Sequence, residues 1–162
     1  MLAHRALLST VVVFGFATVA EAETKEIDHT FCGVAATSTI VPGEDHGVYH
    51  TSFHGVISAD NASDPLNGTT GRCDVMHEWS GAGGDHIRTV GYCVATDLDG
   101  DSVTMLSERD DGGVASYTIL RGTGKWEGAT GQATATPVAL GKRDATGQNV
   151  ICSQLDGEIT TP

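Results

Sequence analysis

Histidine is the residue type in this sequence that offers the most chemistry. His50 and His54 share one face of their segment, because side chains alternate along a β-strand with a period of two. His77 and Glu78 follow in the next segment of alternating residues. A cross-strand pairing of the two segments predicts either a general acid–base pair near neutral pH among these four residues or a transition-metal site of imidazole type. The metal ligands would be His50, His54 and His77.

The same alternation supports a second arrangement of that segment. Phe53 and Ile57 lie on the face opposite His50 and His54. If Phe53 and Ile57 face the core, the two histidines face solvent. An error of one residue in the register exchanges the two faces, so the sequence leaves both arrangements open.

A cluster of acidic residues suggests a calcium site. Four of them fall at positions 1, 3, 5 and 12 of a notional EF-hand loop: Asp97, Asp99, Asp101 and Glu108. Gly100 stands at position 4, whereas the EF-hand requires glycine at position 6, and both flanks have the pattern of strands. The pattern therefore favours a hairpin turn, at which Asp97, Asp99 and Asp101 still offer oxygen ligands to calcium.

Composition excludes several classes of function. The chain has 162 residues, 40% apolar and 19% charged, which indicates one folded domain at about 100–200 residues per domain. Its net charge of −12 disfavours nucleic acid and anionic membranes as partners. The sequence contains neither a phosphate-binding P-loop nor a G-x-S-x-G nucleophile motif, so hydrolysis has no support, and no cofactor is indicated.

The N-terminal segment predicts export. Residues 1–22 combine a short positive start, an apolar stretch from Ala6 to Val19 and a small-x-small cleavage site that ends at Ala22. We expect cleavage after Ala22, a single mature domain over residues 23–162, and a secreted or periplasmic protein. No apolar run reaches the ~18–20 residues of a membrane span, so we expect no membrane association after cleavage.

The elements that must position these side chains are β-strands. Alternating apolar residues, frequent threonine and valine, and glycine-rich turns predict eight strands. We expect them at Thr30–Val41, Val48–Ala59, Gly71–Trp79, His86–Thr96, Ser102–Arg109, Val114–Arg121, Gln132–Val138 and Asn149–Ile159. Short turns favour antiparallel neighbours, which form either a closed up-and-down barrel or a two-sheet sandwich. We favour the barrel because closure removes the strand edges.

The four cysteines agree with a closed barrel. An exported chain with an even number of cysteines and no zinc-ligand spacing favours two disulfides, with three connectivities. Cys32 lies in the first expected strand and Cys152 in the last, and these strands become neighbours only if the sheet closes. Cys73 and Cys93 lie in the third and fourth strands. We therefore expect the pairs Cys32–Cys152 and Cys73–Cys93.

Two segments resemble a known superfamily. They are Gly91–Asp101 (GYCVATDLDGD) and Arg121–Gln132 (RGTGKWEGATGQ), and together they resemble small exported members of the allene oxide cyclase and dirigent barrels. The resemblance implies an eight-stranded, calycin-like barrel whose interior holds an apolar or aromatic small molecule. In plant relatives the cavity guides cyclisation of an epoxide or coupling of phenoxy radicals, so an enzyme of this kind is isomerase-like or cyclase-like. No catalytic position of the plant enzymes matches a residue here.

Two main functions follow. The first is a small exported barrel that binds, and isomerises or cyclises, an apolar or aromatic molecule. The second is a non-enzymatic, disulfide-linked module that acts through its surface or as a homo-oligomer, and histidine-based metal binding is a third alternative. Asn61 and Asn67 match the N-glycosylation pattern, which matters only in a eukaryotic secretory pathway.

Overall fold

Alternating side chains and short turns produce eight antiparallel strands in the computed structural model. It describes residues 21–41, 43–81, 85–110, 113–141 and 148–162. The strands are β1 (Glu23–Val41), β2 (His46–Ser58), β3 (Thr70–Ser80), β4 (Asp85–Thr96), β5 (Ser102–Asp110), β6 (Ala115–Gly122), β7 (Thr130–Leu140) and β8 (Gln148–Thr161). A 3₁₀ turn, η1 (Gly124–Trp126), precedes β7. The expected signal peptide falls mostly on residues 1–20, outside the described residues.

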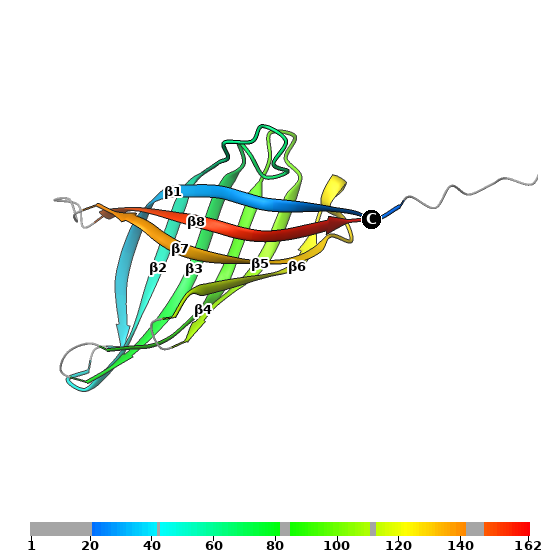
Figure 1. The fold of residues 1–162 in the computed structure, drawn as a ribbon. Helices are drawn as coiled ribbons and strands as arrows, with labels where there is room; N and C mark the ends of the chain where they lie inside the picture. The colour runs from blue at the N-terminus through cyan, green and yellow to red at the C-terminus, as the bar shows by residue number, and fades with distance from the viewer. Residues whose placement is uncertain (1–20, 42, 82–84, 111–112, 142–147) are drawn as a thin grey trace, which may run out of the picture.

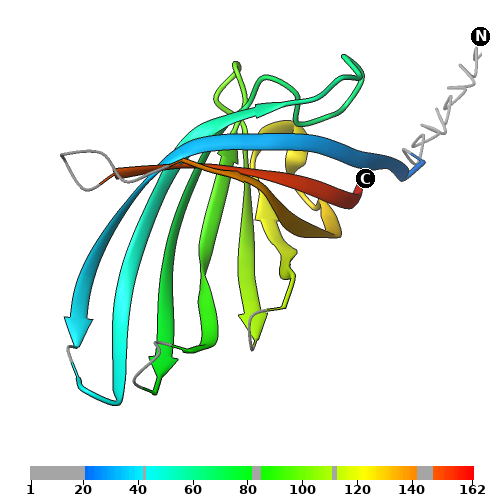
Figure 2. The same ribbon diagram turned by 60° about the vertical axis from the view of Figure 1, so that its left-hand side comes forward.

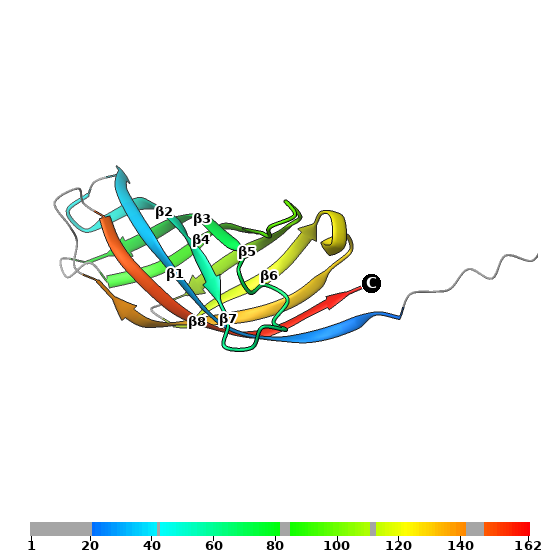
Figure 3. The same ribbon diagram turned by 90° about the horizontal axis from the view of Figure 1, so that it is seen from above.

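The sheet closes into a barrel, as the sequence predicts. Each strand pairs with its neighbours in the chain, and β1 pairs with β8 over fourteen positions, from Glu23–Thr161 to Ala36–Gln148. In Figures 1 and 2, β1 in blue and β8 in red run side by side along the wall. The order β7, β8, β1, β2 around the barrel can be followed in Figure 3. The two-sheet sandwich is therefore not formed.

The first strand begins earlier than expected. β1 starts at Glu23 and not at Thr30, and its added residues pair with the end of β8. Ile27 and His29 point inward and are buried, while Glu26 and Asp28 are exposed on the outer face. The charged residues made this segment look like loop, although a barrel strand accepts charge on its outer face.

The two disulfides have the predicted pairing and lie on opposite sides of the wall. Cys32–Cys152 joins β1 to β8, with Cys32 exposed on the outer surface. Cys73–Cys93 joins β3 to β4, with Cys93 buried inside the barrel. The first disulfide thus fastens the seam where the sheet closes. The second forms part of the inner wall. Among the described residues, no helix is long and apolar enough to cross a membrane.

One end of the barrel is plugged by side chains from loops. Leu66, from the loop after β2, and Trp126, from η1, are buried in one apolar cluster with Val103 and Ile159. This cluster lies at the end of the barrel where β1 begins and β8 finishes. It makes that end the packed floor of the molecule.

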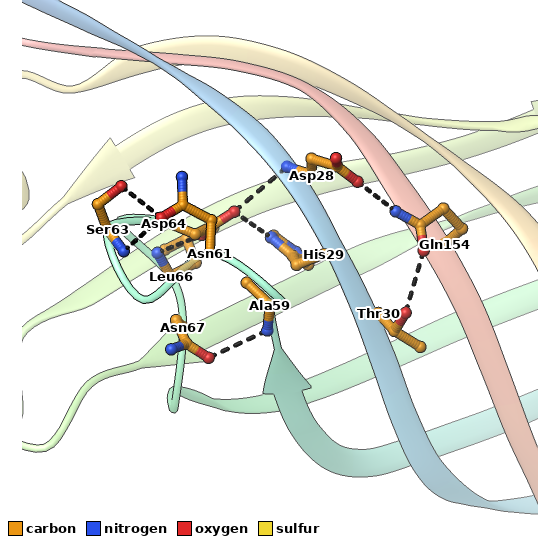
Figure 4. Close-up of polar contacts among 10 residues, drawn as sticks. All are labelled: Asp28, His29, Thr30, Ala59, Asn61, Ser63, Asp64, Leu66, Asn67 and Gln154. Atoms are coloured by element: carbon orange, nitrogen blue, oxygen red, sulfur yellow. Dashed lines mark hydrogen bonds and ion pairs between the residues drawn. The ribbon is translucent and has the colours of Figure 1, made fainter.

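The loop after β2 is tied to β1 by one carboxylate. Asp64 accepts hydrogen bonds from the backbone N–H of Leu66 at 2.8 Å and of Asp28 at 3.2 Å, and it lies 3.3 Å from Nδ1 of His29 (Figure 4). Burial lowers the pKa of His29 although Asp64 opposes the shift. A neutral His29 therefore donates from Nδ1 to Asp64, and the loop that carries Leu66 stays on the barrel.

The two N-glycosylation sequences lie in this same loop. Asn61 and Asn67 are both exposed. Their side-chain oxygens accept hydrogen bonds within the loop, from Ser63 to Asn61 and from the backbone N–H of Ala59 to Asn67. Both side chains therefore stabilise the loop through their oxygen atoms.

Candidate functional site

The barrel encloses an open cavity of about 350 Å³. It occupies the half of the barrel away from Leu66 and Trp126. Most of its lining is apolar and includes Phe31, Phe53, Val75, Met105, Ile151 and Leu155. Phe53 and Ile57 therefore face inward, so the second of the two arrangements considered for β2 is correct. A pocket of this size and character suits a small molecule.

Four polar residues form a continuous row across the inner wall. In the strand register, Tyr49 of β2 stands opposite His77 of β3, His77 opposite Thr89 of β4, and Thr89 opposite Arg109 of β5. All four line the cavity. They lie near the open end, because β3 and β5 finish there and β2 and β4 begin there. We call these residues the polar row.

A chain of hydrogen bonds links two histidines through the polar row. Nδ1 of His77 and Nε2 of His86 each lie 2.7 Å from the hydroxyl of Thr89. The hydroxyl has one proton, so it donates to one imidazole and accepts from the other. A shift of both protons along the chain therefore carries one proton, with its charge, from one imidazole ring to the other. This arrangement couples the cavity to His86.

The environment keeps His77 neutral. Burial lowers the pKa of His77 to about 4, and the positive charges of Arg109, His86 and His50 add to the shift. The ring stacks on Tyr49 with 4.6 Å between the ring centroids. At neutral pH, His77 is thus an uncharged imidazole that can accept or relay a proton but carries no charge into the cavity.

Arg109 and Tyr117 complete the polar part of the wall. Nε of Arg109 is buried and has no hydrogen-bond partner among the described residues. Burial raises the pKa of Tyr117, while a hydrogen bond with Ser107 and the charge of Arg109 oppose the shift. The phenol is therefore protonated at neutral pH and offers a hydroxyl group to a ligand.

The expected grouping of histidines is not formed. His50 stands opposite Met76 and His54 opposite Arg72, so neither pairs with His77 or Glu78. Both lie on the face of β2 opposite Phe53, whereas His77 lines the cavity. Within the described part of the chain, no group of three or more His, Cys, Asp or Glu residues is placed to hold a metal ion.

The outer histidines instead make carboxylate contacts on the surface. Nε2 of His50 lies 3.3 Å from Asp74, and Nε2 of His46 lies 3.4 Å from Glu78. Glu78 is thus an outer-face residue. Of the four candidate acid–base residues, only His77 reaches the cavity.

The acidic turn is occupied by the protein's own donors. One oxygen of Asp97 accepts the backbone N–H groups of Asp99 and Asp101, and the other accepts from Nε1 of Trp126 and lies 2.8 Å from Nζ of Lys125. Glu108, on β5, instead contacts Arg88 on β4. The calcium arrangement is therefore not assembled, and the turn is the expected hairpin.

This contact explains why the two segments of the resemblance occur together. The first segment supplies the carboxylates of Asp97 and Asp101, and the second supplies η1, which docks on them. Gly124 has a φ of +55°, and a Cβ there would lie 1.9 Å from the carboxylate of Asp101. Glycine is thus required for the close approach.

We expect Asp97→Asn to have a lower free energy of unfolding than the wild type at neutral pH, and we expect this difference to shrink in acid. The ammonium group of Lys125, with hydrogen bonds from Trp126 and two backbone N–H groups, lowers the pKa of Asp97 from 3.8 to about 2. The folded state gains from this ionisation above pH 3.8 and loses the gain as pH falls toward 2. Urea unfolding of both proteins at pH 6 and pH 2.5 measures how far the difference in free energy of unfolding decreases.

The control for this prediction lies in the same turn. Asp99 is 79% exposed, so Asp99→Asn removes the same charge without removing backbone hydrogen bonds. We expect it to resemble the wild type at both pH values. If the free energies of unfolding of wild type and Asp97→Asn differed by the same amount at both pH values, the ionised Asp97 carboxylate would not be the group that stabilises the fold.

Sequence reasoning missed Thr89, Arg109 and Tyr117. A usable signal was present, because Val103, Met105, Ser107 and Arg109 follow a period of two in one strand. Once the first two are placed inside, Arg109 must point inward. Arg109 is the last residue of the expected strand Ser102–Arg109, and the sequence alone assigns it no role.

Comparison with known proteins supports the fold. No family model matches the chain, and no curated protein matches it. Among solved structures, a pterocarpan synthase dirigent protein is similar, with a TM-score of 0.56 over 96% of this chain and 97% of the other, at 14% sequence identity. Together with the eight-stranded closure, this similarity gives the chain the fold of a dirigent-like barrel.

Proposed function

We propose that this chain is an exported barrel that binds an apolar or aromatic small molecule in its cavity. The open cavity of about 350 Å³ carries the proposal, because a barrel filled by its own side chains has no room for a ligand. Its lining is mainly aromatic and aliphatic, with a few polar groups in one row. Such linings bury the body of a ligand and orient it through few hydrogen bonds.

Export is part of the same proposal. Residues 1–22 have the pattern of a signal peptide, and β1 begins at Glu23, directly after the expected cleavage site. Two disulfides are typical of oxidising compartments. These observations support a secreted or periplasmic protein.

Isomerisation or cyclisation of the ligand is the finer form of the proposal. His77 supports it, because a neutral imidazole at the cavity wall, linked through Thr89 to His86, can take a proton from one ligand atom and return it to another. Such a reaction changes bonding within the ligand without a co-reactant. The similar dirigent protein is named a pterocarpan synthase, and that activity belongs to that protein.

A surface-acting module is the second candidate. The outer face near the Cys32–Cys152 disulfide exposes Val34, Val56 and Val150 on neighbouring strands. Exposed apolar side chains in a group favour contact with another protein surface, including a second copy of the chain. The binding experiment below separates this candidate from the first.

We expect the neutral fluorophore N-phenyl-1-naphthylamine to bind inside the barrel, and Ser153→Phe to weaken its binding by about tenfold or more. Ser153 lines the cavity on β8, so a phenyl group there occupies the ligand volume. Fluorescence titration measures the affinity. Circular dichroism checks that the variant is folded.

The matched control is Ser116→Phe. Ser116 is exposed on the outer side of β6, so the same substitution there leaves the cavity unchanged and the affinity as in the wild type. Absence of binding to the wild type would refute cavity binding and favour the surface module. Equal binding to wild type and Ser153→Phe would place the probe outside the barrel, with the same consequence.

A further inference from the structure

The cavity and the whole chain carry opposite charge. The net charge of the chain is −12. None of the described residues that line the cavity is an aspartate or a glutamate, whereas Arg72 and Arg109 are both among them. The wall of the cavity is thus a local positive region in an acidic protein.

The two arginines differ in their partners. Nε of Arg72 donates to Asp74 at 2.9 Å, and the Arg72 side chain is 62% exposed, so its charge is balanced on the outer surface. Arg109 forms no ion pair with a carboxylate among the described residues, and its Nε is buried without an acceptor. The charge of this guanidinium group therefore has no carboxylate partner among the described residues, and an anionic group bound in the cavity would supply one.

The surroundings of Arg109 show that its charge acts inside the cavity. Burial is the main reason that the pKa of His77 is low, and Arg109 lowers it further. Arg109 also opposes the rise that burial causes in the pKa of Tyr117. Both neighbours are uncharged at neutral pH, so neither neutralises the guanidinium group.

The position of Arg109 sets the direction of a ligand. Arg109 lies in the polar row near the open end, at the end of β5, while Met105 and Leu155 line the apolar wall deeper in the barrel. A ligand that fits both parts has its polar group near the opening and its apolar body toward the plugged end.

We propose that the cavity selects a ligand with an apolar or aromatic body and one anionic oxygen group, such as a carboxylate, a sulfonate or a phenolate, which pairs with the guanidinium group of Arg109. This inference deepens the proposed function and rests on it. It assigns Arg109 as the residue that determines specificity for the anion.

Two fluorophores with the same aromatic body test the inference. N-phenyl-1-naphthylamine is neutral, and 8-anilinonaphthalene-1-sulfonate adds one sulfonate to it. With the disulfide-bonded protein at pH 7, we expect the sulfonate to bind at least about tenfold more tightly than the neutral probe, since hydrogen bonds to charged groups contribute this much. Arg109→Gln should remove that preference, so that the two probes bind the variant with affinities within about twofold of each other.

The matched control removes the same charge from the other side of the wall. Arg88 lies on β4, is 52% exposed, and contacts Glu108 at 3.5 Å on the outer surface. We expect Arg88→Gln to bind both probes as the wild type does. A loss of sulfonate binding in Arg88→Gln equal to that in Arg109→Gln would show an effect of net charge alone and overturn the assignment of Arg109.

A measurement on the wild type keeps the inference testable if Arg109→Gln does not fold. Naphthalene-2-carboxylate and the neutral naphthalene-2-carboxamide compete with the bound neutral probe, and the carboxylate should displace it at about tenfold lower concentration. Equal displacement by the two compounds would overturn the anion preference while leaving cavity binding intact. Failure of the neutral fluorophore to bind the wild type would overturn the proposed function itself.

Discussion

Replacing Cys32 and Cys152 together by alanine should lower the free energy of unfolding by about 5 kcal/mol, which corresponds to a fall of about 10–20 °C in Tm. The disulfide joins residues 120 positions apart, so it removes much of the conformational freedom of the unfolded chain. Cys32 is exposed on the outer face, and its loss removes little packing. Urea and thermal unfolding under non-reducing conditions measure the effect.

The Val34→Ala, Val150→Ala double variant is the control for the seam. Val34 and Val150 stand opposite each other on β1 and β8, point outward and are largely exposed. Their truncation changes the same strand pair without removing a crosslink, so we expect a loss within about 1 kcal/mol. If the variant without the disulfide were as stable as the wild type, the backbone hydrogen bonds of the fourteen paired positions would hold β1 and β8 together without it.

The seam also matters for the cavity. β1 and β8 contribute Phe31, Ala35, Ile151 and Leu155 to the lining. If the sheet opened along this line, one side of the pocket would separate from the other. Loss of the disulfide should therefore weaken probe binding at temperatures below the global unfolding of the variant, because local opening precedes unfolding of the core.

The fold could be predicted from the sequence because several local signals agree. Turns rich in glycine and aspartate separate the strands, and the cysteines indicate which strands meet at closure. The early part of β1 was missed because Glu23, Lys25 and Glu26 give a segment the appearance of loop. Its inward residues, Ile27 and His29, become recognisable as a strand face only once β8 is known to run beside them.

The site was harder to predict because a strand pattern does not say which face is inside. In β2, one face carries histidines and the other carries Phe53 and Ile57, and the sequence permits either in a barrel with a cavity. The packed apolar end of the barrel determines which face points inward. Ile57 belongs to the core cluster, so Phe53, on the same face of β2, also points inward. The polar row depends further on the register of four strands, and single strands carry no information about it.

The 3₁₀ turn η1 was also not expected as an element. Its residues read as a glycine-rich link, and its order comes from Asp97 and Asp101, more than twenty positions earlier in the chain. The resemblance pointed to these two segments without saying why they belong together. The contact between them gives the physical reason and leads to the last prediction.

Trp126→Ala should lower the free energy of unfolding by about 3–5 kcal/mol, because it removes a large buried side chain and leaves a void in the core. Trp126 is 4% exposed and packs in the apolar cluster that plugs the barrel. Its Nε1 donates to Asp97 at 3.1 Å, and Lys125 lies 5.5 Å above its ring. Urea unfolding followed by circular dichroism measures the loss.

Two further variants separate the contributions of packing and of the hydrogen bond at Trp126. Trp126→Phe keeps most of the buried area but removes the N–H donor together with part of the ring, so we expect a smaller loss than for Trp126→Ala, of about 1–2 kcal/mol. Leu98→Ala, in the turn that η1 contacts, truncates a side chain that is 94% exposed and should change stability by less than about 0.5 kcal/mol. If Trp126→Ala cost no more than Trp126→Phe, the hydrogen bond to Asp97, and not the packing of the indole ring, would hold η1 on the barrel end. The packing of η1 on the barrel end would then depend on the turn at Asp97. In that case, substitution of Asp97 should lower the free energy of unfolding as much as substitution of Trp126.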